Sequence, residues 1–232
     1  MIRAVVFDID GTLIDHIGAE RAAVRSLFGS LRRLIPCPSV EEFAQVWHAE
    51  AERHMRFHLA GELTFAEQRV KRVQSVFARW GRVVSDEEAM RVFGEYLRWY
   101  EENWRLYEDV LPCLRSLNDY RLGIVSNGDG EQQRNKLRCT GIASFFSSTV
   151  ISGDTGVAKP KAAIFERSLH DLALSAEEAV YVGDCLELDP IGASQAGLRG
   201  VWLDRSGVSR NVNPSVITIA SLEELPDVVG GM

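Results

Sequence analysis

The feature that most constrains this chain is a series of short apolar runs rich in β-branched residues. The first covers residues 3–7, and the others cover 122–126, 148–151, 179–183 and 201–203. Runs of this length and composition are typical of buried strands. Segments of helical length separate the later runs, and strands that alternate with helices predict a parallel sheet. We therefore predict an α/β fold with a doubly wound parallel sheet.

A long stretch without strand character interrupts this alternation after the first strand. From residue 16 to residue 107 the apolar residues recur at helical spacing, with breaks near 35–38, Gly61 and Gly81. The pattern predicts four helices. Ser85 and Glu88 fit a capping box at the start of one of them.

The interruption predicts two domains. Residues 1–15 and 108–232 are expected to form the α/β domain, and residues 16–107 an inserted all-helical domain, which we call the cap. We interpret the cap tryptophans as packing residues and the histidines as surface or structural residues, because aromatic anchors are what a helical core needs.

Composition narrows the range of partners. The net charge of -7 and the lack of a basic stripe disfavour nucleic acid. No apolar run approaches the roughly 20 residues of a membrane span, and the amino terminus lacks the pattern of a secretory signal. The four cysteines show no Cys-x-x-Cys spacing, which disfavours zinc and disulfides. We expect a cytoplasmic monomer or homodimer with no membrane partner.

Polar residues follow the predicted strands at the points where they end. Because the carboxyl ends of parallel strands meet at one edge of a sheet, these residues are expected to lie together. Each alone is also typical of a turn or a helix cap, but the combination favours a site. The set consists of Asp8, Asp10 and Thr12 after the first strand, Ser126 and Asn127 after the second, Lys159 beyond the third, and Asp184 and Asp189 after the fourth.

The four carboxylates in this set indicate a cation. Carboxylates that share one crevice repel each other and raise one another's pKa unless a positive charge is present. Carboxylate oxygens suit Mg²⁺ better than zinc, and Mg²⁺ commonly binds through carboxylates together with a substrate phosphate. Lys159 supplies a second positive charge.

These motifs, in this order, resemble those of the haloacid dehalogenase superfamily. The resemblance rests on Asp-x-Asp-Gly-Thr at 8–12, Ser-Asn at 126–127, Lys-Pro at 159–160 and Gly-Asp-x4-Asp at 183–189. The helical insertion resembles the C1 cap of the phosphatase branch. Residues 106–117 and 126–128 are similar to the nucleotidase-like and N-acylneuraminate-9-phosphatase-like groups.

The resemblance implies a Mg²⁺-dependent phosphatase that acts on a small phosphorylated metabolite, a nucleoside monophosphate or a sugar phosphate. Asp8 would attack phosphorus and become an aspartyl phosphate, and Asp10 would act as general acid and base. The metal ligands would be the carboxylates of Asp8 and Asp184 and the backbone carbonyl of Asp10.

The remaining motif residues are implied to bind the phosphate or to support the site. Thr12, Ser126, Asn127 and Lys159 would contact phosphate oxygens, and Lys159 would also neutralise the transferring group. Asp189 would hold Lys159 or a metal-bound water. Cys185 and Leu188 depart from the Ser and Asn that are common at these positions, so the resemblance assigns no role to those two side chains.

Four alternatives stay open at this point. One is a non-catalytic binding protein, which would have no reason to keep both Asp8 and Asp10. A phosphomutase of the same superfamily shares the motifs. A 2-haloacid dehalogenase also uses an aspartate nucleophile, but generally lacks an acid where Asp10 stands. A phospho-accepting receiver-like signalling domain has a similar set of residues, but is about half as long and has no cap.

Overall fold

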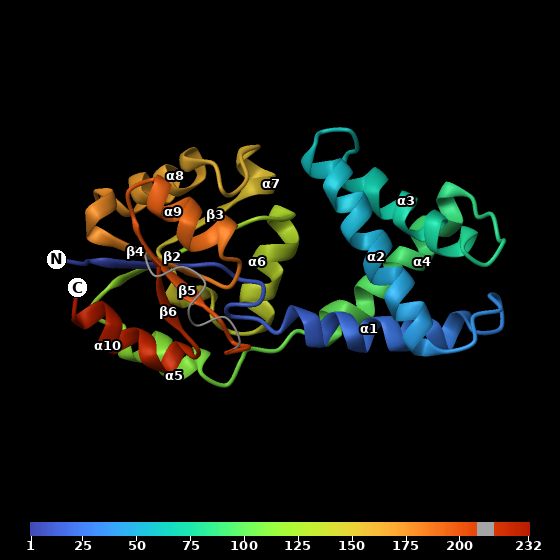
Figure 1. Ribbon diagram of the computed structural model, residues 1–232, viewed down its shortest axis with the longest axis horizontal. Helices are drawn as coiled ribbons and strands as arrows, with labels where there is room; N and C mark the ends of the chain where they lie inside the picture. Colours follow the sequence, from blue (N-terminus) through green and yellow to red (C-terminus); the bar gives the residue numbers. More distant parts are fainter. Residues whose placement is uncertain (208–215) are drawn as a thin grey trace. The chain divides into compact units, whose positions relative to one another are not determined.

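The computed structural model describes residues 1–207 and 216–232. The chain folds into two compact units (Figure 1). The first combines Met1–His16 with Arg105–Met232, and the second is Ile17–Trp104.

The first unit is built on a parallel sheet with the strand order β3-β2-β1-β4-β5-β6. The strands are β1 (Ala4–Phe7), β2 (Arg121–Ser126), β3 (Ser148–Ile151), β4 (Ala179–Gly183), β5 (Arg199–Leu203) and β6 (Ile217–Ile219). This topology confirms the α/β prediction. The sequence did not indicate β6, a three-residue edge strand that begins at the exposed Ile217.

β1 lies at the centre of the sheet and is buried on both faces. Ala4 and Val6 belong to one hydrophobic cluster, whereas Val5 and Phe7 belong to another. A strand covered on both faces must be apolar throughout, which is why the sequence shows a continuous run here.

Helices cover both faces of the sheet. Figure 1 shows α8 and α9 on one face and α5 and α10 on the other. The helices of this unit are α5 (Val110–Ser116), α6 (Gly130–Cys139), α7 (Ser152–Thr155), α8 (Ala162–Leu172), α9 (Gly192–Gln195) and α10 (Leu225–Gly230). Short 3₁₀ turns lie at η1 (Ala143–Phe145), η2 (Ala176–Glu178) and η4 (Leu222–Glu224), and a π turn lies at η3 (Glu187–Ile191).

The second unit consists of α1–α4, which pack around an aromatic core. The helices are α1 (His16–Leu31, which begins at the last residue of the first unit), α2 (Val40–Leu59), α3 (Phe65–Ala78) and α4 (Asp86–Glu102). The Phe43 ring lies 5.9 Å from the rings of Trp47 and Trp80. The guanidinium of Arg72 lies 4.4 Å from the Trp47 ring and forms an ion pair of 3.2 Å with Glu20.

The helix starts show one difference from the sequence prediction. Ser85 accepts a hydrogen bond from the Glu88 backbone, but the Glu88 carboxylate accepts from Arg82 at 2.9 Å. The predicted capping box therefore forms only its first half. A complete box occurs at Thr64 and Glu67, at the start of α3.

The chain leaves the first unit and returns to it at neighbouring points. Ile14 and Leu106 form an isolated bridge, and the backbone amide of Asp15 donates to the carbonyl of Arg105 at 3.0 Å. The two segments that connect the units therefore lie side by side, next to the loop that follows β1. In the part of the chain that the structure describes, no helix combines the length and apolarity that crossing a membrane requires.

Candidate active site

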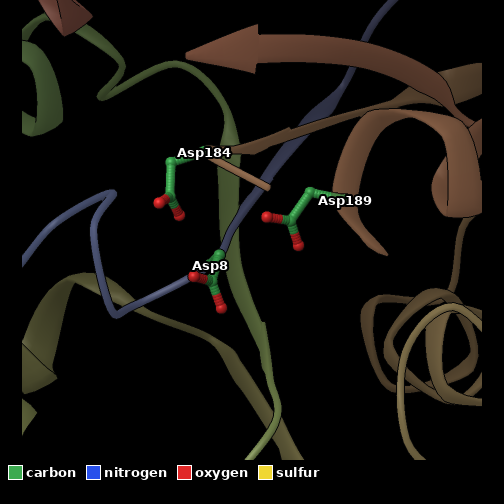
Figure 2. Close-up of side chains that lie close together, drawn as sticks. All are labelled: Asp8, Asp184 and Asp189. Atoms are coloured by element: carbon green, nitrogen blue, oxygen red, sulfur yellow. The ribbon is translucent and has the colours of Figure 1, made fainter. Parts of the chain in front are cut away.

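Three acidic side chains converge where β1 and β4 end. Phe7 at the end of β1 pairs with Val182 of β4, and the Asp8 amide donates to the Val182 carbonyl at 2.9 Å. Asp184 is the first residue after β4, and Asp189 lies in the π turn η3. One carboxylate oxygen from each of the three lies within 4.8 Å of the others, and Figure 2 shows the three side chains close together.

Two glycines make this convergence possible. Gly11 has a φ of +81°, and a Cβ there would lie 2.2 Å from Oδ2 of Asp184. A Cβ on Gly183 would lie 2.3 Å from Cγ of Asp189. Side chains at either position would push the carboxylates out of the cluster, because carbon and oxygen cannot approach so closely.

Lys159 supplies the positive charge of the cluster. Its ammonium donates to Oδ1 of Asp8 at 2.7 Å and to Oδ1 of Asp189 at 2.6 Å. It also donates to the hydroxyl of Tyr181 at 3.0 Å. Burial by itself lowers the pKa of Lys159, but the attraction of the two carboxylates outweighs burial and raises that pKa. Lys159 is therefore a fixed cation.

The negative charge of the three carboxylates exceeds the positive charge of Lys159 beside them. Burial, with Asp189 adding to it against the opposing pull of Lys159, raises the pKa of Asp8 to about 6. Burial and then Asp8 and Asp189 raise the pKa of Asp184 to about 7. Three carboxylates and one ammonium leave an excess of two negative charges, which is the charge that a divalent cation balances.

The hydrogen bonds made by the carboxylate oxygens separate the acids that fit a metal ion from the acid that supports the site. Oδ1 of Asp189 is held by Lys159, and Oδ2 accepts from the Cys185 amide at 2.9 Å. Asp8 has only one oxygen engaged by the described residues, and Asp184 accepts a longer bond of 3.3 Å from Thr12. Asp8 and Asp184 thus fit a hard cation that prefers oxygen, whereas Asp189 is committed to its neighbours.

Asp10 lies beside this cluster and has partners of its own. Lys136 of α6 donates to its two carboxylate oxygens at 2.6 and 2.7 Å, and Gln133 donates to Oδ2 at 2.9 Å. Burial favours a raised pKa for Asp10, but Lys136 and then His16 outweigh it and lower the pKa. Sequence reasoning did not find Lys136 or Gln133.

The predicted phosphate-binding residues lie near these acids. Ser126 is buried, and its hydroxyl accepts from Gln133 at 3.0 Å. The Asn127 side chain accepts from the Lys159 amide at 2.8 Å and donates to the Lys159 carbonyl at 3.2 Å. The Asn127 side chain therefore fixes the Lys159 backbone, and its contact with phosphate stays a prediction, as do those of Thr12 and Ser126.

Arg205 fixes the loop that carries the first motif. Its guanidinium donates to the carbonyls of Gly11 at 3.2 Å and Thr12 at 2.7 Å, and binds both oxygens of Asp109. No sequence pattern pointed to Arg205, which lies beyond the last motif. Tyr181 was hidden within an apolar strand. Gln133 and Lys136 were detectable only as polar residues three apart on a helix whose inner face needs apolar ones.

Position 185 carries Cys in place of the more common Ser, and one contact of the site there does not involve the side chain. Cys185 binds Asp189 through its backbone amide, so this contact does not depend on the side chain.

Comparison with known proteins shows which family and which proteins the chain is similar to. The family model described as haloacid dehalogenase-like hydrolase matches residues 2–197. Glyceraldehyde 3-phosphate phosphatase of Methanopyrus kandleri is 30% identical, over 92% of this chain and 88% of that protein. N-acylneuraminate-9-phosphatase of Homo sapiens is 28% identical, over 97% of this chain and 92% of that protein.

A solved structure shows the same architecture. The HAD-hydrolase YfnB of Bacillus subtilis, solved with magnesium bound, superposes with a TM-score of 0.81 at 27% identity. The match covers 98% of both chains. The YfnB structure reveals interdomain movement.

Proposed function

Because the chain belongs to the haloacid dehalogenase-like hydrolases and is a hydrolase of phosphoric monoesters, we propose that it cleaves small phosphomonoesters with Mg²⁺ through an aspartyl phosphate on Asp8. The observation that carries this proposal is the buried cluster of Asp8, Asp184 and Asp189 around Lys159. It combines a nucleophile, an excess of negative charge and one fixed cation at the end of the central strand.

The first half of the reaction uses Asp8 and Asp10. A carboxylate oxygen of Asp8 forms a bond to phosphorus while the bond from phosphorus to the leaving oxygen breaks. Asp10, in its acid form, gives its proton to the departing oxygen and becomes a carboxylate. Lys159 lies 2.7 Å from Asp8 and attracts the equatorial phosphoryl oxygens, whose charge it offsets.

The second half regenerates the enzyme. The Asp10 carboxylate takes a proton from water, the water oxygen bonds to phosphorus, and the bond from phosphorus to Asp8 breaks. Phosphate leaves, and Asp10 again carries the proton for the next turnover. The contacts that hold Asp10 beside Asp8 therefore serve both halves.

Asp8 and Asp184 fit the metal by donor type and by charge, and the Asp10 carbonyl is the third protein ligand that we propose. Bound Mg²⁺ supplies charge neutralisation between the carboxylates and the phosphoryl group. The presence of magnesium in the YfnB structure supports this choice of ion.

The substrate that we propose is a phosphorylated carbohydrate. The sequence favoured a nucleoside monophosphate first and a sugar phosphate second, but the names of the relatives support the reverse order. One relative is named for a three-carbon aldehyde phosphate and the other for a phosphorylated sugar acid. The roles that we propose for the motif residues concern the phosphoryl group, the metal and the leaving oxygen, so the rest of the substrate must be recognised elsewhere in the chain.

We propose that the helical unit Ile17–Trp104 acts as a cap. It is inserted directly after the loop that carries Asp8, Asp10 and Thr12, and its two connections lie side by side. A pair of adjacent connections is a natural hinge for movement of one unit against the other.

The test is phosphate release with purified protein. p-Nitrophenyl phosphate, a panel of sugar phosphates and nucleoside monophosphates, and a phosphopeptide are compared with Mg²⁺ and with EDTA. We expect Mg²⁺-dependent release, with the highest kcat/KM for a sugar phosphate. Preference for the phosphopeptide would contradict the cap proposal, and full activity in EDTA would contradict the metal proposal.

Asp10 disfavours the dehalogenase alternative, since attack on carbon needs no acid at that place. A phosphomutase would transfer the phosphoryl group to a second sugar phosphate. Measuring transfer against release of inorganic phosphate separates the mutase from the phosphatase.

A further inference from the structure

The carboxylate of Asp10 is held by two residues of α6 that no motif contains. Lys136 Nζ lies 2.6 Å from Oδ1 and 2.7 Å from Oδ2, and Gln133 Nε2 lies 2.9 Å from Oδ2. Both side chains are buried, with exposed fractions of 2% for Lys136 and 1% for Gln133. A buried lysine and a buried glutamine that share one carboxylate form a built contact rather than a chance surface pair.

The two carboxylate oxygens of Asp10 accept different numbers of hydrogen bonds. A carboxylate oxygen has about two lone pairs that can accept hydrogen bonds. Oδ2 uses both, one for Lys136 and one for Gln133, whereas Oδ1 uses one for Lys136. Among the contacts of the described residues, Oδ1 therefore keeps one acceptor site. The side chain of Asp10 is 27% exposed, so the carboxylate is not wholly closed off from a reactant.

Gln133 also connects Asp10 to the loop that carries Ser126 and Asn127. The same amide nitrogen lies 3.0 Å from the Ser126 hydroxyl and 3.2 Å from the Asn127 carbonyl. One side chain thus spans the acid of the first motif and the loop of the second. A shift of either loop would change the direction of the Asp10 carboxylate.

We propose that Lys136 is a positioning residue, which with Gln133 orients Asp10 so that Oδ1 delivers the proton to the leaving group. The proposal rests on the proposed phosphatase function and deepens it. In the step concerned, the bond from phosphorus to the leaving oxygen breaks and the Oδ1 proton moves to that oxygen. Lys136 gives up no proton in this step.

Two esters of similar size but different leaving groups test the proposal. p-Nitrophenolate departs readily without a proton, whereas phenolate is more basic and depends more on the acid. The value of kcat/KM reports phosphoryl transfer, so its ratio between phenyl phosphate and p-nitrophenyl phosphate isolates proton delivery. Loss of a positioned acid costs about 10²-fold or more. Removing the Lys136 charge also favours the acid form of Asp10, because Lys136 lowers the pKa of that carboxyl. The two effects oppose each other, so we expect Lys136→Met to lower the ratio by only about tenfold, and any fall reports lost positioning.

The matched control is Arg134→Met. Arg134 lies on the same helix and carries the same charge, but it is paired with Asp154 on the exposed side, so we expect an unchanged ratio. Gln133→Met removes the second contact and should lower the ratio in the same direction, which keeps the test decisive if Lys136→Met does not fold. In an Asp10→Asn background, Lys136→Met should leave the ratio unchanged, because its effect passes through Asp10.

The outcomes separate this inference from the proposed function. A wild-type protein that releases no phosphate from either ester with Mg²⁺ overturns the proposed function. If the wild type is active and the folded Lys136→Met and Gln133→Met variants have the same ratio as the wild type, only the positioning role is overturned. A further drop of the ratio in the Asp10→Asn background also overturns it.

Discussion

Removal of the Lys159 ammonium should destabilise the protein strongly and in a way that depends on Mg²⁺. The ammonium lies 2.7 Å from Asp8 and 2.6 Å from Asp189, and all three side chains are buried. Breaking a buried ion pair by removal of one partner costs about 3–5 kcal/mol, because the other charge is left without compensation. Lys159→Met keeps the length of the stem and removes only the charge.

The assay is equilibrium unfolding in urea at mildly alkaline pH in EDTA. We expect the free energy of unfolding of Lys159→Met to fall by about 3–5 kcal/mol. Added Mg²⁺ should recover part of the loss, since it compensates the same carboxylates. Lys161→Met is the matched control, because Lys161 is exposed two residues away and its loss should change stability by less than about 0.5 kcal/mol. A loss below about 1 kcal/mol for Lys159→Met would refute the electrostatic account.

The acidic cluster and Gly11 each lead to a further prediction. The pKa of Asp8 is raised from 3.8 to about 6, and that of Asp184 from 3.8 to about 7. Between pH 3.8 and about pH 7 the folded state therefore holds more protons than the unfolded state. The melting temperature in EDTA should therefore fall as pH rises through this window, and Mg²⁺ should reverse the fall at its upper end; thermal scans that show a rise would contradict this. Gly11→Ala should abolish Mg²⁺-dependent activity and weaken Mg²⁺ binding in calorimetric titration, because its Cβ would lie 2.2 Å from Oδ2 of Asp184. Gly61→Ala, at a similar positive φ with no atom within 4 Å, should cost about 1–2 kcal/mol of stability and leave Mg²⁺ binding unchanged.

The sheet was predictable from the sequence because the strands near its centre are buried on both faces. In a chain with this alternation, a continuous apolar run such as residues 3–7 indicates a central strand, since few other elements need apolar residues at every position. β6 lacked that signal, because a short edge strand with an exposed end needs no apolar run. The π turn that carries Asp189 was also not foreseen, since it depends on close packing against Gly183.

The convergence of the acids was also predictable, because parallel strands that end at one edge place their following residues side by side. How each acid is held was not. Tyr181 looks like one more apolar strand residue, and Lys136 looks like a solvent-facing residue of a polar helix. Their contacts depend on which side of each element faces the site, and only the folded chain shows that.

The central claim is that Asp8 carries the phosphoryl group during turnover. The most direct measurement is rapid acid quenching of the protein with substrate and Mg²⁺, followed by mass spectrometry of the peptide that contains Asp8 and Asp10. The account predicts one added phosphoryl group on Asp8, present in wild type during turnover and absent in Asp8→Asn, which should also release no phosphate. A phosphoryl group on another residue, or phosphate release by Asp8→Asn at a rate near wild type, would contradict the claim.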